Sequence, residues 1–265
     1  MERSSTRFEI APDHGVSELE RLLEQLGPGQ LPADSRCIYD GRNRLHRLAH
    51  GGVDLVIKHF RLRSGLKRWS YRFRSFKAER AFRNALRLGE LGINTPQPVA
   101  FVNRVAGGSI VEAWFICHFE DAELNLRDVL NHRVPEGELD HLIDATARFV
   151  ATLHERGIIH WDLTPGNILI SRDDSAPDDW RFSLIDCNRM GFCRPNIRQR
   201  CFNLAQCAFH TAGLERFLAA YIDASGISPW WLRLNYRLVS LRYNGLRVLK
   251  NKTRRLRRGL QGRTD

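Results

Sequence analysis

Two stretches decide how this chain is read: GIIHWDLTPGNILI at residues 157–170 and FSLIDCNR at residues 182–189. The first places Asp162 and Asn167 in the pattern H-x-D-L-x-x-x-N, between two short apolar runs. A Pro-Gly pair between these two residues permits a tight loop, which would bring the asparagine back towards the aspartate. The second stretch is a short apolar run that ends in Asp186. Each piece alone is a weak signal, but their order along the chain indicates one site.

The chain before these stretches is rich in strand patterns, and the chain around and after them is mainly helical. Turn signals at Asp40-Gly41 and Gly51-Gly52 separate apolar runs. Strands are predicted at Val53–Phe60, Val99–Val102, Ile110–Phe119 and Phe182–Ile185. Helices are predicted at Ser17–Leu26, at Ser75–Leu88 with Gly89 or Gly92 closing it, along an apolar stripe at Leu139–Leu153, and throughout the chain after about Arg198. A hinge is expected near Phe119–Glu123.

Composition indicates an ordinary globular protein. The 265 residues are 43% apolar and 27% charged, enough for one large domain or two small lobes. No apolar run approaches the ~18 residues that cross a bilayer, and the first residues lack the apolar block of a signal peptide. The six cysteines form no CxxC and no zinc-type cluster, so they are expected to be reduced thiols, several of them buried. A cytoplasmic location is the default expectation.

The formal charge of +11 is concentrated in two segments, Arg61–Arg80 and the tail from Arg247 to Arg263. Basic segments attract polyanions such as nucleic acid, anionic lipid headgroups or phosphorylated glycans. The alternative is that the tail is only a solvated helix end. Composition does not separate these possibilities.

The two opening stretches resemble the catalytic loop and the metal-binding segment of protein-kinase-like enzymes. The resemblance implies an α+β, bilobal fold with a β-rich N-lobe and a helical C-lobe. The N-lobe is expected at residues 1–120, and the C-lobe, with the catalytic loop and the basic tail, at residues 121–265. It also implies that the cofactors are ATP and Mg²⁺.

The resemblance assigns roles to the polar residues of the two stretches. Asp162 is expected to be the catalytic carboxylate, which accepts the proton of the attacking hydroxyl. Asn167 and Asp186 are expected to bind Mg²⁺, since hard oxygen ligands suit this ion. His160 is expected to hold the loop together. Arg189 is a candidate for contact with a phosphate.

The first half of the chain supplies the other parts that such a fold needs. Lys58 lies in the apolar strand VDLVIKHF and is expected to grip the ATP phosphates. Glu79 shares a helical stripe with Phe76, Phe82 and Leu86, and an inward carboxylate is costly unless it is paired. Lys58 is therefore the expected partner of Glu79, and a nearby arginine is the alternative.

Two further assignments concern the nucleotide. Phe119 is expected to lie beside the adenine at the hinge. The segment Gly41–Leu48 lacks the GxGxxG pattern of a phosphate-covering loop. It could still cover the phosphates with its backbone N–H groups and with Arg42 or Arg44, or it could be an ordinary hairpin turn.

Departures from the protein-kinase pattern narrow the choice of acceptor. Trp161 stands where regulated protein kinases usually carry arginine, Thr164 replaces a common lysine, and Asp186-Cys-Asn-Arg replaces D-F-G with no A-P-E after it. The segments GRNRL, AERAFRNALRLGELGINTPQPVAF, HWDLTPGN and IDCNRMGF are similar to the lipopolysaccharide kinases, which phosphorylate Kdo or heptose. That resemblance runs over about Gly41 to Cys193.

The resemblance to lipopolysaccharide kinases implies a partner and a location. The acceptor would be a sugar hydroxyl of the lipopolysaccharide core or lipid A precursor, or of another anionic glycolipid. The enzyme would work at the inner face of the inner membrane, with the basic tail making peripheral contact. Nucleic acid is the less favoured partner.

Three alternatives remain open at this point. One is a small atypical Ser/Thr protein kinase of the RIO or Bud32 kind, which also lacks A-P-E. Another is a soluble small-molecule kinase that resembles aminoglycoside or choline phosphotransferases. The last is a non-catalytic pseudokinase, against which the presence of Lys58, Glu79, Asp162, Asn167 and Asp186 argues.

Overall fold

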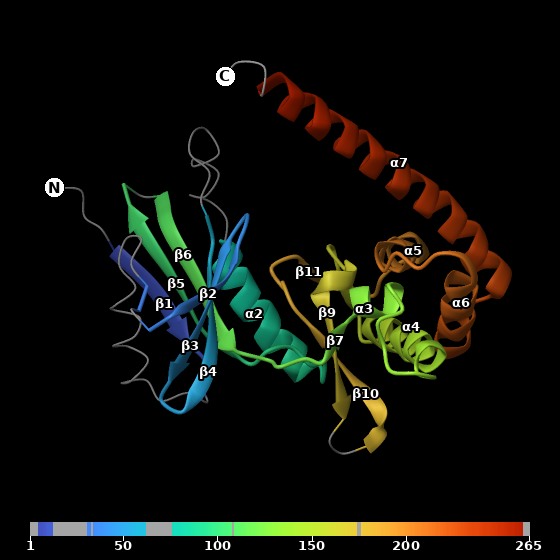
Figure 1. Ribbon diagram of the computed structural model, residues 1–265, viewed down its shortest axis with the longest axis horizontal. Helices are drawn as coiled ribbons and strands as arrows, with labels where there is room; N and C mark the ends of the chain where they lie inside the picture. The colour runs from blue at the N-terminus through green and yellow to red at the C-terminus, as the bar shows by residue number, and fades with distance from the viewer. Residues whose placement is uncertain are drawn as a thin grey trace. The chain divides into compact units, whose positions relative to one another are not determined.

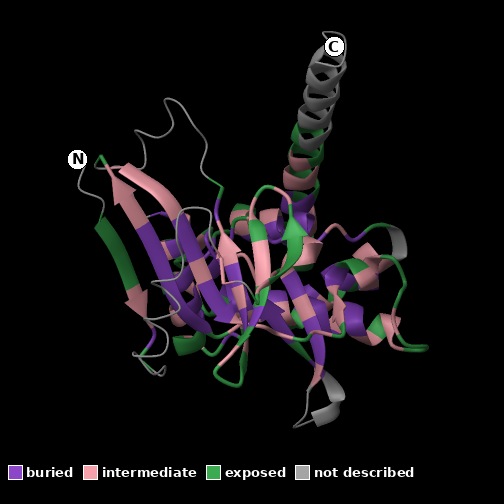
Figure 2. Cartoon of the chain, turned by 60° about the vertical axis from the view of Figure 1, so that its left-hand side comes forward, coloured by how far each residue is buried: buried purple, intermediate pink, exposed green. Residues whose placement is uncertain are grey.

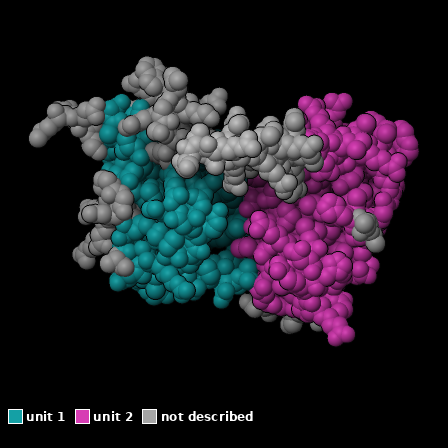
Figure 3. Space-filling model, turned by 45° about the horizontal axis from the view of Figure 1, so that its top comes forward, with its two compact units in different colours: residues 1–122, 183–189 teal, residues 123–182, 190–265 magenta. Residues whose placement is uncertain are grey.

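The computed structural model describes residues 5–12, 31–32, 34–61, 76–107, 109–173 and 176–261. The predicted helix Ser17–Leu26 and most of the basic segment Arg61–Arg80 lie outside these residues. The chain forms two compact units (Figure 3): unit 1 comprises residues 1–122 and 183–189, and unit 2 comprises residues 123–182 and 190–265. The chain first passes from one unit to the other between Ala122 and Glu123, within the segment for which a hinge is predicted.

Unit 1 is built on an antiparallel sheet with the strand order β1-β5-β6-β4-β3-β2 (Figure 1). Its described elements are β1 (Ser5–Ile10), β2 (Arg36–Asp40), β3 (Arg44–His50), β4 (Val53–His59), α2 (Lys77–Glu90), β5 (Pro98–Ala106) and β6 (Ser109–His118). The turns predicted at Asp40-Gly41 and Gly51-Gly52 join β2 to β3 and β3 to β4. Gly51 and Gly52 have φ of 59° and 76°, a left-handed conformation that glycine adopts without strain.

The sheet buries side chains on both of its faces. Residues that lie directly opposite in a ladder share a face, so Lys58 shares one with Leu45 and Phe115. The core on the α2 side consists of Ala11, Phe60, Phe76, Ala78, Phe82, Phe101 and Ala113. The other core contains Leu48, Leu55, Ile57, Val99, Ala100, Val102, Trp114 and Ile116. Figure 2 shows the buried residues following the central strands.

Helix α2 agrees with the predicted helix Ser75–Leu88, displaced by two residues at each end. Its inner face buries Ala78, Ala81, Phe82, Ala85 and Leu88. Gly92 closes it with φ of 66°, and the N–H of Ile93 donates to the carbonyl of Leu88 at 2.9 Å. The proline-containing segment that follows leads into β5, which is longer than the predicted strand Val99–Val102.

Residues 183–189 belong to unit 1 although 60 residues of unit 2 precede them. The N–H of Leu184 donates to the carbonyl of Asn94 at 2.9 Å, and the hydroxyl of Thr95 donates to the carbonyl of Leu184 at 2.7 Å. Further on, Asn84 Nδ2 donates to the carbonyl of Cys187 at 2.6 Å. Three contacts from α2 and the turn after it thus attach this segment to the sheet unit.

Unit 2 combines helices with short strands. Its described elements are β7 (Leu124–Asn125), α3 (Leu126–Leu130), α4 (Leu139–Glu155), β8 (Ile158–His160), the 3-10 turn η2 (Pro165–Asn167), β9 (Ile168–Asp173), most of β10 (Ala176–Leu184), β11 (Met190–Phe192), α5 (Ile197–Gln206), α6 (Thr211–Ser225) and α7 (Pro229–Gln261). Strands β10, β9 and β7 form one sheet, and β11 pairs with β8. The predicted α+β order, with strands first and helices later, is confirmed.

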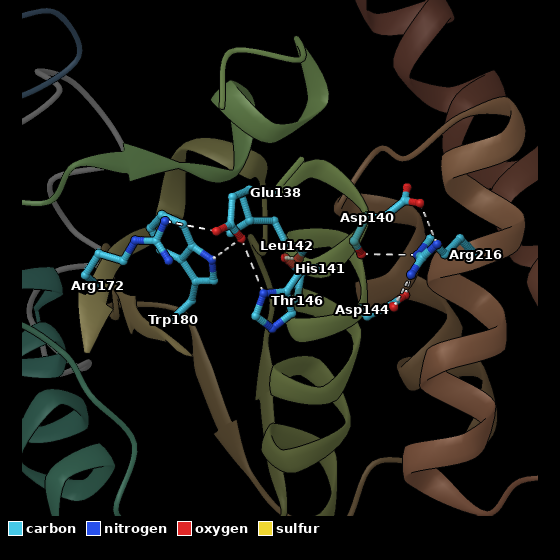
Figure 4. Close-up of polar contacts among 9 residues, drawn as sticks. All are labelled: Glu138, Asp140, His141, Leu142, Asp144, Thr146, Arg172, Trp180 and Arg216. Carbon is cyan, nitrogen blue, oxygen red and sulfur yellow. Dashed lines mark hydrogen bonds and ion pairs between the residues drawn. The ribbon is translucent and has the colours of Figure 1, made fainter. Parts of the chain in front are cut away.

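Helices α4 and α6 are joined by an arginine clamp, drawn in Figure 4. The guanidinium of Arg216 on α6 lies 2.7 Å from Asp140 and 2.5 Å from Asp144, and its Nε donates to both the carbonyl of Asp140 and the carboxylate of Asp144. The fork of Arg216 matches two carboxylates one turn apart on α4. The clamp therefore fixes the angular position of α4 against α6.

A second cluster in Figure 4 fixes the start of α4. Glu138 accepts hydrogen bonds from Arg172 at 3.0 Å and from Trp180 Nε1 at 3.3 Å, and it also contacts His141. The guanidinium of Arg172 stacks over the ring of Trp180, 3.9 Å from its centroid. The bonds from Arg172 and Trp180 hold the pKa of Glu138 below its usual range.

Unit 2 also contains a fully buried polar network between α4, α5 and α6. Arg200 donates to the hydroxyl of Tyr221 at 3.2 Å, and this hydroxyl lies 2.8 Å from Nδ1 of His154. His154 Nε2 lies 3.2 Å from Oδ1 of Asn203, whose Nδ2 donates elsewhere. Since Oδ1 can only accept, Nε2 of His154 carries the proton and Nδ1 accepts from Tyr221. Burial lowers the pKa of His154 to about 4, so the ring is neutral.

All six cysteines are free thiols, as predicted, and Cys117, Cys187, Cys201 and Cys207 are buried. Burial raises the pKa of Cys187, the neighbour of Asp186, to about 11. The thiol therefore stays protonated at neutral pH, and its role next to the polar segment is packing.

We predict that Arg216→Met lowers the free energy of unfolding by about 1 kcal/mol, since it removes a forked, two-carboxylate contact at a partly exposed site. Urea denaturation at neutral pH measures this change. The matched control is Arg233→Met, whose contact to Glu215 is longer, at 3.6 Å. Equal losses in the two variants would contradict the clamp.

We predict that His154 makes the protein less stable as the pH falls. The folded-state pKa of about 4 lies below the usual 6.5, so between these values the unfolded chain binds a proton that the folded chain excludes. The stability is fully present above pH 6.5 and falls by about 3 kcal/mol towards pH 4. His154→Gln keeps a donor and an acceptor but cannot be protonated, so its unfolding free energy should depend less on pH. Equal pH dependence in both proteins would refute this assignment.

Candidate active site

The loop that carries Asp162 begins at a buried two-stranded hairpin. Strand β8 is fully buried and pairs with β11, so that Met190 lies opposite His160. The chain then leaves the hairpin, turns through η2 and re-enters a sheet as β9. Pro165 starts η2, where its fixed φ suits the first position of a helical turn.

Hydrogen bonds within the loop bring Asp162 and Asn167 together. The N–H of Asp162 donates to Nδ1 of His160 at 3.0 Å, and its carbonyl accepts from the N–H of Thr164 at 2.7 Å. The same carbonyl accepts from Nδ2 of Asn167 at 2.8 Å. The asparagine thus returns to the aspartate as its spacing predicts. Because Nδ2 is committed to this bond, Oδ1 is the atom of Asn167 suited to a hard cation.

Two side-chain amides of α5 hold the backbone of this loop. Asn203 Nδ2 donates to the carbonyl of His160 at 2.7 Å. Gln206 Nε2 donates to the carbonyl of Trp161 at 3.1 Å, and its Oε1 accepts from the N–H of Leu163 at 3.2 Å. Gln206 therefore bonds the backbone on both sides of Asp162. Neither amide could be identified from the sequence, because nothing in their local pattern separates them from other polar residues of a helix.

Trp161, which replaces the usual arginine, is partly exposed and contacts one aromatic ring. Its indole lies 6.2 Å from the ring of Phe202 on α5, and Phe202 meets Tyr243 of α7 edge to face at 5.6 Å. A Cβ at Gly191 would lie 2.7 Å from Ile159 and 3.3 Å from the indole nitrogen, so only glycine allows the hairpin to approach this closely.

Arg127 on α3 is a third residue that the sequence pattern did not indicate. A Cβ at Gly166, inside the Pro-Gly-Asn turn, would lie 2.7 Å from its guanidinium. The arginine side chain is exposed and lies directly against the loop that carries Asn167. It therefore adds a positive charge beside the loop, from a helix that carries no recognisable motif.

In unit 1, Lys58 and Asp186 form an ion pair. The ammonium of Lys58 lies 2.7 Å from Oδ1 of Asp186, and the side chains are 15% and 33% exposed. Asn188 Nδ2 donates to the same carboxylate oxygen. The backbone of Asp186 is left-handed, with φ of 58°, a conformation that aspartate tolerates better than most residues. The predicted phosphate lysine and the predicted metal ligand therefore meet.

The predicted ion pair between Lys58 and Glu79 is not what the structure shows among its described residues. Glu79 bonds to Nε of Arg83 at 3.2 Å, and Arg83 also reaches Glu9 of β1 at 2.8 Å. Arg83 stands one turn after Glu79 on α2, which makes it the nearest cation to that carboxylate. The arginine alternative thus describes the observed contact, and a catalytic role of Glu79 stays a prediction.

The remaining predicted nucleotide residues also lie in unit 1. Phe119 follows β6, and the guanidinium of Arg47 stacks 3.8 Å from its ring centroid. The N–H of Phe119 donates to the carbonyl of Asp54 at 2.7 Å. Arg44 is the first residue of β3 and pairs with Asp40 at 3.4 Å, so Gly41–Leu48 is a hairpin turn followed by a strand. Phosphate contact by Arg44 stays a prediction.

The structure thus assembles the site residues in two groups. Lys58 and Asp186 meet in unit 1, and Asp162 and Asn167 meet in unit 2. Asp186 stands four residues before Met190, which pairs with His160 in unit 2.

Comparison with solved structures shows the fold. A structure of WaaP in complex with acyl carrier protein aligns with a TM-score of 0.57 and 20% identity, over 92% of this chain and 98% of that chain. A structure of the Rio2 kinase from Chaetomium thermophilum aligns with a TM-score of 0.44 and 19% identity, over 77% of this chain and 68% of that chain. The match to WaaP confirms the protein-kinase-like fold.

Comparison with known sequences shows the family. A curated relative is the membrane-associated tyrosine- and threonine-specific cdc2-inhibitory kinase of Drosophila melanogaster, 29% identical over 118 residues. The match covers 40% of this chain and 22% of that protein, so the chain spans about a fifth of this relative. Residues 41–221 match the lipopolysaccharide kinase (Kdo/WaaP) family. This range includes the loop with Asp162 and the segment with Asp186. The chain therefore belongs to the lipopolysaccharide kinase (Kdo/WaaP) family and is a kinase.

Proposed function

We propose that this kinase uses ATP and Mg²⁺ to phosphorylate a sugar hydroxyl, of Kdo or heptose, on the lipopolysaccharide core or lipid A precursor. The observation that carries the proposal is the loop in which Asn167 is bonded to the carbonyl of Asp162 at 2.8 Å, within a chain of the lipopolysaccharide kinase family. This bond orients a neutral oxygen ligand next to a carboxylate. Such a pair suits a metal-assisted transfer to a hydroxyl.

Asp162 acts on the acceptor. Its carboxylate takes the proton of the sugar hydroxyl while the hydroxyl oxygen forms a bond to the γ-phosphorus. The bond from that phosphorus to the bridging oxygen of ADP breaks, and ADP leaves with the electron pair. The backbone bonds from Gln206 on both sides of Asp162 keep the carboxylate in one place during this transfer.

Lys58, Asp186 and Asn167 act on the nucleotide. Mg²⁺, when bound, neutralises charge that develops on the phosphate oxygens, and Asp186 and Asn167 would hold it. Lys58, now bonded to Asp186, would instead bind a phosphate when ATP is present, and the carboxylate of Asp186 would then be available as a metal ligand. Without nucleotide, the charges of Lys58 and Asp186 therefore neutralise each other, since an unpaired charge at this largely buried place would be costly.

The acceptor assignment rests on the family and on charge. An anionic glycolipid suits a chain with a formal charge of +11, and Arg127 places one positive charge directly beside the loop of unit 2. The location that follows is cytoplasmic, at the inner face of the inner membrane, with the basic tail in contact with lipid headgroups. The WaaP structure was determined with acyl carrier protein, which makes that protein a partner to test here.

We predict that Asp162→Asn lowers transfer of ³²P from ATP to lipid A precursors by about 10²- to 10⁴-fold, the usual contribution of a positioned base. The melting temperature should change little, because asparagine keeps the shape of the side chain and the loop bonds to His160, Thr164 and Asn167 use the backbone of Asp162. Asp223→Asn, on the exposed side of α6, is the control and should keep full activity. Undiminished turnover in Asp162→Asn would rule out the assigned base.

The same assay should decide the acceptor class. Lipid A precursors with and without Kdo or heptose, a generic protein substrate and soluble amino alcohols are compared under equal ATP and Mg²⁺. We expect transfer to the sugar-bearing precursor. Transfer to protein or to an amino alcohol alone would favour the Rio-like or the small-molecule reading, with Asp162 unaffected as the base.

We predict that Gln206→Ala lowers kcat about 10- to 100-fold while KM for ATP stays nearly constant, because misplacing a catalytic group affects the chemical step more than binding. The control is Gln199→Ala on the same helix, which removes the capping box of α5. That variant should lose stability and keep kcat. A parallel loss of stability and kcat in both variants would show that Gln206 only holds the fold.

A further inference from the structure

Helix α7 has two apolar faces, of which the core uses one. Its inner face buries Leu232, Asn235 and Tyr236, and the thiol of Cys201 on α5 lies against the carbonyl of Leu232. At about 100° per residue, Trp231, Leu234, Leu238 and Leu241 form a stripe on the opposite side. The described side chains of α7 end at Leu246.

The outer stripe is strongly exposed. Trp230, Leu238 and Leu241 are 70%, 62% and 73% exposed, and Trp231 and Leu234 are 45% and 38% exposed. The two tryptophan rings stack with centroids 6.0 Å apart at the start of the helix. Scattered apolar side chains are normal on a surface, but a continuous stripe of this kind marks an interaction site.

The charges of α7 indicate that a partner of the outer stripe is anionic. The helix has no Asp or Glu from Pro229 to Gln261. Arg233 is held by Glu215 at 3.6 Å, whereas Arg237 and Arg242 are exposed and lie on either side of the outer stripe. The sequence continues with seven further Arg and Lys residues between Arg247 and Arg258. The stripe is thus apolar along its centre and cationic along both edges.

Two other occupants fit these features less well. A second copy of α7 would bring two acid-free, strongly cationic helices together, and like charges repel. Nucleic acid would use the arginines but leave the leucines and tryptophans without apolar contacts. An anionic lipid surface satisfies both, because acyl chains receive the stripe and headgroups receive the arginines.

Among the described residues, no helix is long and apolar enough to cross a bilayer.

We propose that α7 lies in the plane of an anionic bilayer surface, with Trp230, Trp231, Leu234, Leu238 and Leu241 facing the acyl chains and Arg237 and Arg242 at the headgroups. The tryptophans suit the boundary between water and hydrocarbon. This surface is separate from the residues assigned to phosphotransfer, and its binding needs neither ATP nor an acceptor. The proposal therefore goes beyond the enzymatic one and specifies a face of the helix rather than the charge of the tail.

The experiment is flotation of the full-length protein with vesicles of phosphatidylcholine alone or mixed with phosphatidylglycerol, without nucleotide. We expect binding to the mixed vesicles and little to the neutral ones. Leu238→Gln with Leu241→Gln should lower the partition coefficient about tenfold or more, since each leucine loses its transfer into hydrocarbon. Arg237→Gln with Arg242→Gln should lower it about tenfold on mixed vesicles and leave binding to neutral ones unchanged.

Ile38→Gln with Val53→Gln is the matched control. It removes two other exposed aliphatic side chains, 45% and 39% exposed, from the strands of unit 1 and should leave vesicle binding unchanged. Brominated acyl chains should quench the tryptophan fluorescence of the wild type more than that of Trp230→Phe with Trp231→Phe. Melting curves of all variants exclude loss of folding as the cause.

Three results would overturn the proposal. Unchanged binding of the double leucine variant would assign membrane contact to the basic tail alone. Absence of vesicle binding together with a concentration-dependent dimer that the leucine variant abolishes would make the stripe an interface between copies. Absence of vesicle binding together with leucine-dependent binding of an acidic protein, such as acyl carrier protein, would make it a protein-docking face. Loss of phosphotransfer in Asp162→Asn changes none of these readouts.

Discussion

The backbone of residues 161–163 leaves the hairpin without joining another strand or helix, so its polar groups need partners from elsewhere. Asn203 and Gln206 supply them by bonding the carbonyls of His160 and Trp161 and the N–H of Leu163. The position of Asp162 in unit 2 depends on these hydrogen bonds to the loop backbone. An amide can donate and accept at once, which a carboxylate or a lysine in the same place cannot do. Asparagine and glutamine therefore suit a loop that presents both carbonyls and an N–H.

The same amides continue into the buried network of His154, Tyr221 and Arg200. His154 donates from Nε2 to Oδ1 of Asn203, which leaves Nδ2 of that amide to bond the carbonyl of His160. The neutral state of the imidazole is required at Nδ1, which accepts from the hydroxyl of Tyr221. The low dielectric of this site makes each bond strong and each unsatisfied group expensive. Helices α4, α5 and α6 are thus linked to the loop by one directional chain of donors and acceptors, in which each member determines the tautomer or orientation of the next.

In unit 1, too, a segment that carries a site residue is held in place by hydrogen bonds from elsewhere in the chain. Segment 183–189 comes from a distant part of the chain and is attached by Thr95, Asn84 and the backbone of Asn94. These contacts place Asp186 against Lys58 at 2.7 Å. Asp186 has a left-handed backbone, and its neighbours Leu184 and Cys187 are held by these hydrogen bonds. The ligand group is positioned by its backbone, and its side chain can change partners.

Much of the fold could be predicted from sequence where the pattern is periodic and the side chains are buried. Helix α2 and the turn at Gly51-Gly52 follow from apolar spacing and glycine conformation, and both are present. Strand β1 was not predicted, because Ser5–Ile10 is an edge strand with mostly exposed side chains, and polar and apolar residues alternate only over its last four positions. The pairing of β1 with β5 comes from tertiary contact, which local pattern does not contain.

The candidate site, like the fold, contains residues that the sequence could indicate and residues that it could not. Asp162, Asn167, Asp186 and Lys58 could be proposed as site residues because phosphoryl transfer requires these residue types in a recognisable order. The partners that position them could not. For Glu79 the sequence left Lys58 and a nearby arginine open as partners, and the structure shows the bond to Arg83, one turn later on α2. Gln206 stands 44 residues after Asp162, and no spacing rule connects a helical amide to a loop that far away in the sequence.

Trp161 shows how a change next to Asp162, the carboxylate to which we assign the transfer, alters the support of the whole loop. An arginine at this position would need an anionic partner, whereas an indole needs apolar neighbours, and it finds Phe202, which in turn contacts Tyr243 on α7. The loop thereby rests on α5, and α5 rests on the inner face of α7. Leu232 and Tyr236 of α7 are buried, and the thiol of Cys201 on α5 lies against the carbonyl of Leu232. The helix with the unused apolar stripe is therefore separated from the catalytic loop by one layer of aromatic side chains, so the surface that we assign to the bilayer and the residue that we assign to catalysis belong to one packed unit.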